Sequence, residues 1–312
     1  MRQPDPQGMK TPLGSNESKI FFPAEKITKG DLLEYYQTIS PIILPYLKDR
    51  PIVLRRFPNG IDEESFYQKA IPVHHPKSMK TVKIKHEERT IEYLMINNGE
   101  SLLYAVNLGS IDLHPFTSRV KKIEYPDYCV LDLDPQELPF DRVVEVAQEC
   151  HAILDSIQIP HYCKTSGGRG LHIYIPLHAR FTHEQSRSFA EQLAVYLHEQ
   201  MPQITSLERS PKKRVKQVYL DCLQNRFGQT LAASYSVRPK KGAPVSMPLD
   251  WEEVRKGLNP LDFTIKNVPA LMKKRPDYFK PVLGPGVTIK MLERLGNVDN
   301  NGNSVGRPRS GR

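Results

Sequence analysis

The stretch YCVLDLDPQELPF, residues 128–140, joins an apolar run to two carboxylates, Asp132 and Asp134, that are separated by one leucine. Tyrosine, valine and leucine favour a buried β-strand, and alternation along a strand places both carboxylates on one face. Two like charges held side by side repel each other unless a cation or a shared proton lies between them. The stretch therefore predicts a strand that ends in a ligand site, as strands commonly do in open α/β sheets.

The paired acids indicate phosphate chemistry without identifying a reaction. Carboxylate oxygens suit Mg²⁺ or Mn²⁺, and these ions in turn hold the phosphates of a substrate. Two alternatives stay open at this point. The acids could be solvated turn residues ahead of Pro135, and the same D-x-D pattern occurs in glycosyltransferases that bind a nucleotide sugar through a metal.

Helical and strand patterns alternate on both sides of this stretch. Residues 28–47 predict a helix that opens on a capping-box-like pair, Thr28 and Asp31, and that Pro41 and Pro45 should kink or end. Further strands are predicted over residues 51–57, 80–85, 89–96, 161–165, 171–177, 216–223 and 231–237. Further helices are predicted around residues 63–70, 99–109, 140–157, 183–201, 251–258 and 287–295. The pattern indicates an α/β or α+β fold, and no compositional break marks a firm domain boundary.

The composition is that of a folded, basic protein. Of its 312 residues, 39% are hydrophobic and 25% are charged, and 44 Lys and Arg against 35 Asp and Glu give a net charge of +9. This charge favours phosphate-bearing partners such as nucleic acid or nucleotides, although a merely basic protein would carry it too. The polar ends, residues 1–17 and 296–312, are expected to be disordered, and the basic C-terminal tail could touch nucleic acid.

Cysteine usage and hydropathy predict a soluble, cytoplasmic protein. The four cysteines are scattered without a C-x-x-C pair, so reduced thiols in the core are expected rather than a zinc site or disulfides. The sequence shows neither a signal peptide nor an apolar run long enough to span a membrane. We therefore expect no membrane partner.

A glycine-rich segment, KTSGGRGLHIYIPL, occupies residues 164–177. Its glycines allow a tight loop whose backbone N–H groups can approach an anion, and Ser166, Arg169 and His172 add a hydroxyl, a guanidinium and an imidazole. The segment is not a P-loop, because G-K-[ST] is missing and a strand rather than a helix follows. A flexible turn with a solvated arginine and a structural histidine is the alternative interpretation.

A third acid and further cations follow along the chain. Asp221 lies near the end of a predicted strand, and three carboxylates suit the two-metal clamp of phosphoryl or nucleotidyl transfer. Arg238 offers a fork of donors that suits a triphosphate, and the basic run with Lys212, Lys213 and Arg214 favours a contact with the DNA backbone. A strand-end cap, a surface arginine and a solvated charged face are the respective alternatives.

The sequence resembles the polymerase domain of bacterial ligase D in three motifs that occur in the same order: VLDLDP, KTSGGRGLHIYIPL and VYLDCLQN…SYSVRP. That domain belongs to the archaeo-eukaryotic primase superfamily and fills ends in non-homologous end joining. The likeness runs from about Lys19 to about Leu295 and includes RRFPNG, NLGSIDLHPFTSR and PDY. It implies one catalytic domain over residues 18–295 with an α+β fold: central mixed or antiparallel sheets, flanking helices and an RRM-like catalytic module.

The resemblance also implies roles for residues of the catalytic centre. By position in the motifs, Asp132, Asp134 and Asp221 correspond to a metal-binding triad for two Mn²⁺ or Mg²⁺ ions. The triphosphate of an NTP or dNTP would be held by Ser166, Arg169, His172 and Arg238, and His114 would lie near the sugar. Two departures are visible. Arg169 stands where a lysine is more usual, and Ser234 replaces the proline of the family's APYSVR pattern.

On the DNA side, the resemblance assigns Lys19 and Lys29 to the downstream 5′-phosphate, and Lys29 also falls at a predicted helix N-terminus, where anions bind. Phe66 and Tyr67 correspond to an aromatic pair that packs on template DNA, although core packing in a short helix is the alternative for either ring.

The implied function is a primase-polymerase that extends primer 3′-hydroxyls at breaks and gaps, with Mn²⁺ and a preference for ribonucleotides. The expected partners are template-primer and gapped DNA, Ku, and a ligase acting in trans, since no K-x-D-G motif occurs in the sequence. We expect a monomer that could pair across a synapsed break. A primase that starts strands de novo and a non-catalytic end-bridging module stay open, although three retained acids argue against a dead site.

Overall fold

The computed structural model describes residues 14–214, 216–292 and 294. The C-terminal tail and most of the N-terminal segment that the sequence predicts to be disordered lie outside these residues. Gly14 and Ser15 are described, and their backbone N–H groups donate to Glu17 Oε1 and Asn107 Oδ1 at 2.8 and 2.9 Å. Hydrogen-bonded residues are therefore described a few positions before the predicted boundary at residue 18.

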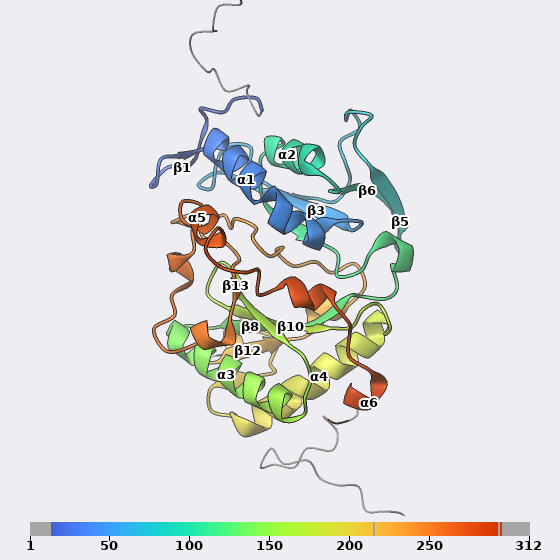
Figure 1. The fold of residues 1–312 in the computed structure, drawn as a ribbon, viewed down its shortest axis with the longest axis vertical. Helices are drawn as coiled ribbons and strands as arrows, with labels where there is room; N and C mark the ends of the chain where they lie inside the picture. The colour runs from blue at the N-terminus through green and yellow to red at the C-terminus, as the bar shows by residue number, and fades with distance from the viewer. Residues whose placement is uncertain (1–13, 215, 293, 295–312) are drawn as a thin grey trace, which may run out of the picture.

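A six-stranded sheet forms the lower half of the molecule in the order β11-β12-β8-β10-β9-β13 (Figure 1). Its neighbours pair antiparallel except for the parallel pair β11 and β12. The strands are β8 (Tyr128–Pro135), β9 (Tyr162–Thr165), β10 (Leu171–Pro176), β11 (Thr205–Ser206), β12 (Val218–Asp221) and β13 (Pro248–Leu249). The helices α3 (Phe140–Ser156) and α4 (His183–Gln200) connect them. The run β8-α3-β9-β10-α4-β12 with spatial order β12-β8-β10-β9 is the RRM-like arrangement that the family resemblance implies.

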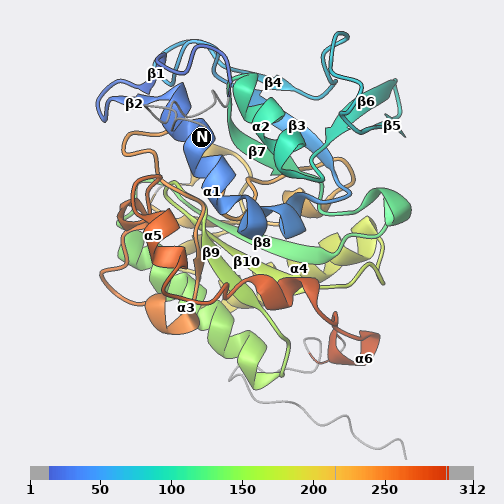
Figure 2. The same ribbon diagram turned by 45° about the horizontal axis from the view of Figure 1, so that its top comes forward.

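Alternation along β8 assigns its two faces. Leu131 and Leu133 are buried, and Cys129 on the same face lies against α4, with its Sγ 3.5 Å from Ser186 O. The helices α3 and α4 cover this face in both views of the molecule (Figure 2). Asp132 and Asp134 therefore point to the opposite face, toward the rest of the chain.

A second sheet is built around β3 (Pro51–Arg56) in the upper half of the molecule. It also contains β4 (Phe66–Gln68), β5 (Thr81–Lys85), β6 (Thr90–Met95) and β7 (Ser110–Pro115). The helices α1 (Lys29–Leu47) and α2 (Gly99–Asn107) pack with it, and the hairpin β1 (Ile20–Phe22) and β2 (Ile27–Thr28) precedes α1. The paired strands predicted at 80–85 and 89–96 are confirmed as β5 and β6.

The start of α1 confirms the predicted capping box. The Thr28 side chain accepts from the Asp31 N–H, and the Asp31 side chain accepts from the Thr28 N–H. The helix does not end at Pro41 or Pro45, however, but continues to Leu47. Its continuous buried face, which includes Leu32, Leu33, Tyr36, Ile39 and Ile43, holds it to the core despite the lost hydrogen bonds.

Three predicted elements are wrong. Residues 63–70 contain the strand β4 instead of a helix, because Phe66 and Tyr67 pair with Arg56 and Arg55 on β3. Residues 231–237 do not form a continuous strand. Their backbone N–H groups donate to acceptors on different segments, and Tyr235 adopts a φ of 65°. Residues 251–258 contain a 3₁₀ turn, Trp251–Glu253, in place of a helix.

The remaining helices are short. Two are α-helical, α5 (Val268–Met272) and α6 (Ile289–Leu292), and the second of these is the described part of the helix predicted at 287–295. The 3₁₀ helices are η1 (Val120–Lys122), η2 (Pro211–Lys213), η3 (Leu223–Asn225), η4 (Trp251–Glu253), η5 (Pro260–Asp262) and η6 (Lys280–Leu283).

Two further features concern the cysteines and the apolar character of the helices. All four cysteines are free and buried, as the sequence predicts. Among the described residues, no helix has the length and apolar character that a membrane crossing requires.

Candidate active site

One row of side chains crosses the six-stranded sheet on the face that α3 and α4 leave open. Asp132 on β8 stands directly opposite Asp221 on β12, and on its other side it stands opposite His172 on β10. His172 in turn stands opposite Lys164 on β9. Because residues that face each other across antiparallel strands project to the same side, the sheet itself brings these four groups together.

Burial and like charge shift the pKa values of the side chains in this row. Burial, followed by the carboxylates of Asp221 and Asp134, raises the pKa of Asp132 to about 7. Burial, followed by the charge of Arg238, lowers the pKa of Lys164 to about 7. Burial also holds the pKa of His172 well below its ordinary value, and its Nε2 lies 3.4 Å from Asp132 Oδ1. Ionisation of the carboxylates in this row is therefore unfavourable in free energy unless a cation lies beside them.

The donor chemistry of the acids suits hard divalent cations. Asp132, Asp134 and Asp221 supply carboxylate oxygens, the ligands that Mg²⁺ and Mn²⁺ prefer. Asp221 already accepts hydrogen bonds from the Leu223 N–H at 2.8 Å and from Gln224 Nε2 at 3.4 Å. Within the described residues, no three His, Cys, Asp or Glu side chains form a cluster that could hold a metal as they stand.

The glycine loop lies beside the acids. Ser166 Oγ accepts from the N–H groups of Gly168 and Gly170, both at 3.1 Å, and the Ser166 N–H donates to Gly170 O at 2.9 Å. The serine therefore closes the loop as well as lining the cavity. Gly167 has a φ of 69°, and a Cβ there would lie 2.4 Å from Arg238 Cγ. The glycines let the loop pack directly against the arginine.

Gly170→Ala should disturb this packing. A Cβ on Gly170 would lie 2.3 Å from Leu133 O, a backbone atom that cannot yield as a flexible side chain would. We expect the substitution to lower the free energy of unfolding by about 1–3 kcal/mol in urea or guanidinium titrations. Gly99→Ala is the matched control, because its Cβ would meet Ser40 Oγ at an ordinary 3.5 Å. Equal unfolding midpoints for the two variants would contradict this reading of the loop.

A buried carboxylate that the sequence did not single out, Asp112, organises the opposite wall. Its Oδ2 lies 2.9 Å from His114 Nε2 and 3.4 Å from Arg238 Nε. Burial opposes its ionised form, but His114, Arg238 and Arg55 outweigh burial, so the pKa of Asp112 lies below its usual value. Asp112 is an anion that holds two predicted substrate-binding groups. The sequence signal was present, since alternation places Asp112 and His114 on one face of β7.

A second residue that was not singled out, Lys240, joins the predicted cations. Burial lowers its pKa, and Arg238 and Arg169 add to the effect by like-charge repulsion. Its Nζ would lie 2.8 Å from a Cβ placed on Gly168, so it extends over the glycine loop. Arg238 Nη1 donates to Ser166 O at 2.7 Å. Three cations thus gather around one loop, which is the charge pattern that a triphosphate requires.

These groups line one cavity of about 490 Å³ between the two sheets. From the upper sheet it is lined by Tyr67 and His114, whose rings meet edge to face at 5.7 Å. The other lining residues singled out from the sequence are Asp132, Asp134, Ser166, Arg169, His172 and Arg238. Asp221 does not line this cavity but adjoins Asp132 in the row.

The predicted phosphate-binding lysines lie together at the open end of the β1–β2 hairpin. The Lys29 N–H donates to Lys19 O at 2.8 Å, and α1 begins at Lys29 as predicted. Lys29 Nζ donates to Ser15 O at 2.7 Å, and Lys19 Nζ donates to Asn59 Oδ1 at 2.6 Å. Burial, with the charge of Lys19 second, lowers the pKa of Lys29. The two lysines are therefore neighbours, and the charge of one acts on the other.

The remaining DNA candidates differ in exposure. Phe66 and Tyr67 are 47% and 57% exposed, so neither is a core residue, and Arg56 and Arg55 lie over their rings. Lys212 and Lys213 are exposed. Arg214 is buried, with its guanidinium 3.6 Å from the centre of the Tyr219 ring. Arg214 therefore packs into the fold rather than facing a ligand.

Comparison with known proteins assigns the family. Residues 28–279 match the family described as "LigD, primase-polymerase domain". The chain belongs to this family. Among LigD proteins, it is 35% identical over 260 residues to the Bacillus subtilis bifunctional non-homologous end joining protein, covering 82% of this chain and 42% of that one. It is 33% identical over 246 residues to the multifunctional Pseudomonas aeruginosa protein, covering 77% of this chain and 29% of that one.

The fold of the LigD polymerase domain is shared as well. The structure superposes on the polymerase domain of Mycobacterium tuberculosis ligase D, solved in complex with DNA, with a TM-score of 0.81 and 23% identity. The match covers 88% of this chain and 98% of that domain. The chain thus spans less than half the length of the two LigD relatives but nearly all of one polymerase domain. The predicted primase-type fold is confirmed.

Proposed function

We propose that the chain is a template-dependent nucleotidyltransferase that extends a primer 3′-hydroxyl at DNA breaks and gaps during non-homologous end joining. One observation supports it most: the acid row of Asp221, Asp132 and His172 adjoins the cavity into which Arg169, Arg238 and Lys240 gather. The carboxylates suit the divalent metal ions that accompany a nucleoside triphosphate. The three cationic side chains suit its negatively charged phosphates.

The chain's residues would share the work as follows. Asp132, Asp134 and Asp221 would hold two Mn²⁺ or Mg²⁺ ions, which when bound lower the pKa of the primer hydroxyl and neutralise the leaving pyrophosphate. Arg238 and Lys240 would bind and orient the triphosphate over the glycine loop. Their positive charges lie where negative charge builds up on the leaving pyrophosphate. The glycine loop and Asp112 hold these side chains in place before the substrate binds.

His114 supports a preference for ribonucleotides. Its Nε2 faces Asp112, so Nδ1 is the ring nitrogen left to meet a sugar hydroxyl in the cavity. A ribose 2′-hydroxyl offers a hydrogen-bond partner there, and a deoxyribose does not. Discrimination based on a hydrogen bond to a substrate hydroxyl is strong, because the enzyme group is otherwise left unpaired.

Extension of a gapped duplex tests the proposal. We expect incorporation of NTP to exceed that of dNTP and Mn²⁺ to support more activity than Mg²⁺. A 5′-phosphate across the gap should increase extension, and Lys29→Ala should lower extension on the phosphorylated gap to the level of the unphosphorylated one. Lys290→Ala, an exposed lysine on α6 at the other end of the molecule, is the control (Figure 1). Stimulation that survives in Lys29→Ala would remove the role given to Lys19 and Lys29.

Two other functions are separated by the same assay. Products formed from template and nucleotides without a primer would establish a primase that starts strands de novo. End bridging without any incorporation would establish a non-catalytic module. In a cell, the proposed activity would act on DNA ends in the cytoplasm beside Ku and a ligase acting in trans, as a monomer that could pair with a second copy across a break.

A further inference from the structure

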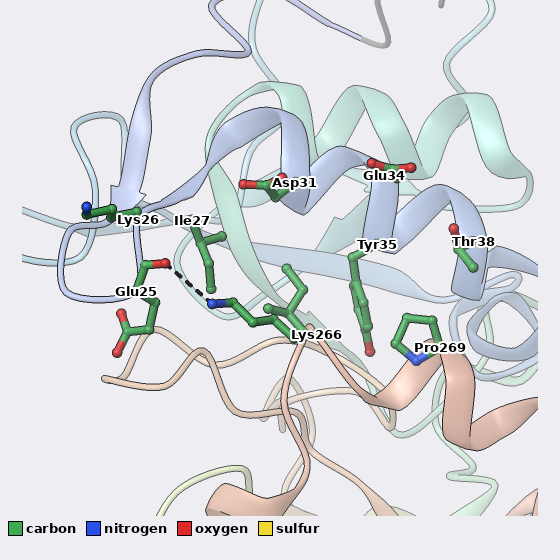
Figure 3. A pocket seen from close by; sticks show the side chains of 10 residues that line it. Glu25, Lys26, Ile27, Asp31, Glu34, Tyr35, Thr38, Lys266 and Pro269 are labelled. Carbon is green, nitrogen blue, oxygen red and sulfur yellow. Dashed lines mark hydrogen bonds between the residues drawn. The ribbon is translucent and has the colours of Figure 1, made fainter.

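The β1–β2 hairpin connects two regions that the proposed function uses. Its open end carries Lys19 and Lys29, and its turn, residues 23–26, carries Glu25. The turn reaches a segment more than 200 residues later in the chain: Glu25 Oε1 accepts a hydrogen bond from the Gly242 N–H at 2.5 Å. Lys266 Nζ lies 3.5 Å from Glu25 O in the same place (Figure 3).

Gly242 belongs to the turn that carries the cations of the cavity. The Lys240 N–H donates to Arg238 O at 2.8 Å, and the Ala243 N–H donates to Lys240 O at 3.0 Å. Gly242 itself has a φ of 86°, a conformation that suits glycine. The turn is therefore a small rigid unit, and its position determines where Arg238 and Lys240 meet a triphosphate.

The contact of Glu25 is polar and adjoins open space. A cavity of about 380 Å³ lies between the hairpin turn, α1 and the segment before α5, and Glu25, Tyr35 and Lys266 are among its lining residues (Figure 3). Packing therefore does not fill the space beside the hairpin turn. Glu25 Oε2 is buried and has no hydrogen-bond partner among the described residues. A carboxylate kept in such a position against its desolvation cost suggests a function for the contact.

We propose that Glu25 is a positioning residue that couples the 5′-phosphate site to the triphosphate site. An anion held between Lys19 and Lys29 orders the open end of the hairpin, and the Glu25–Gly242 hydrogen bond transmits that order to the turn of Arg238 and Lys240. The enzyme then binds its nucleotide best when a downstream end is in place. The coupling rests on the proposed function, whereas the contact between Glu25 and the turn does not.

Hydrogen exchange tests the contact without any catalysis. In Glu25→Ala, amides of residues 238–244 should exchange about five-fold faster than in the wild type, because one hydrogen bond to the turn is lost. Glu25→Gln keeps an acceptor oxygen and should restore protection. Glu34→Ala removes a carboxylate from the wall of the same cavity and should leave exchange unchanged. Unchanged exchange in Glu25→Ala would overturn the proposal whether or not the chain is a polymerase.

Addition of DNA tests the coupling. In the wild type, a gapped duplex with a 5′-phosphate should protect residues 238–244 more than the same duplex without it, and Glu25→Ala should abolish the difference. The same variant should raise KM for NTP about five-fold with little change in kcat. Equal protection by the two duplexes in the wild type, or a loss confined to kcat, would overturn the coupling. Extension that fails in the wild type while these protection differences persist would count against the polymerase function alone.

Discussion

Asp132→Ala is expected to abolish primer extension while binding to gapped DNA changes little. Asp132 is the centre of the acid row, with Asp221 opposite on β12 and Asp134 two residues along the same strand. Its removal takes away the central carboxylate of the three that would hold the proposed ions, and groups that act as a unit in catalysis fail together. We expect single-nucleotide extension, measured with saturating Mn²⁺ and NTP, to fall by about 10³-fold or more.

The control for this prediction is Asp155→Ala, which removes an exposed carboxylate from α3, on the covered face of the sheet. It should extend primers at the rate of the wild type. DNA affinity, followed by fluorescence anisotropy in the absence of metal, should be similar in all three proteins. Substantial extension by Asp132→Ala would remove the acid row from the mechanism.

Asp132→Asn should also stabilise the metal-free protein. Because the folded-state pKa of Asp132 is raised to about 7, folding at neutral pH opposes ionisation of this carboxyl. The amide keeps the shape and removes the charge, so we expect the free energy of unfolding at pH 8 in chelator to rise by about 0.5–2 kcal/mol. The gain should shrink as the pH falls below 7 and should disappear only near or below the unfolded-state pKa of 3.8, where the carboxyl is protonated in both the folded and the unfolded state. A variant less stable than the wild type at pH 8 would contradict this account of charge crowding.

Sequence patterns predicted the parts of the site that depend on local periodicity. The D-x-D pair required only that residues 128–135 form a strand, because alternation then sets the face of both acids. The glycine loop and His172 followed in the same way, since a tight turn between two strands fixes the register of the second. Asp221 could be recognised as a strand-end acid, but its place opposite Asp132 comes from strand order, which a single sequence does not determine.

The features that the sequence patterns did not indicate depend on tertiary structure. Residues 63–70 have an amphipathic pattern that favours a helix, yet β3 offers a free edge to which Phe66 and Tyr67 pair. Arg214 lies in a run of charges that favours a contact with the DNA backbone, but in the structure it is buried, with its guanidinium over the Tyr219 ring. Glu25 meets Gly242 only because the hairpin and a distant turn meet in space. No local pattern could have indicated these partners.

Asp112→Asn is expected to have the second largest effect, through two substrate-side residues at once. Asp112 is fully buried, and His114 and Arg238 both approach the same oxygen, Oδ2. The amide fills the same volume but carries no charge, so Arg238 loses the anion that offsets its partly buried charge. His114 then faces an uncharged amide that can turn either its oxygen or its NH₂ group toward Nε2, so a carboxylate no longer selects the histidine's tautomer. Removal of one member of a buried ionic group typically destabilises a protein by about 3–5 kcal/mol.

Catalysis should fall further than the folded fraction can explain. Misplacement of substrate-orienting groups commonly costs about 10²-fold, so we expect kcat/KM for NTP to fall by about 10- to 100-fold per folded molecule, mostly through KM. The ratio of NTP to dNTP incorporation should also fall, because His114 is no longer held toward the sugar. His114→Ala is the comparison. This variant should lose the preference for NTP over dNTP but keep more of its affinity for the triphosphate, since Arg238 still lies beside Asp112. If both variants raise KM equally, Asp112 acts through His114 alone and its link to Arg238 carries no function.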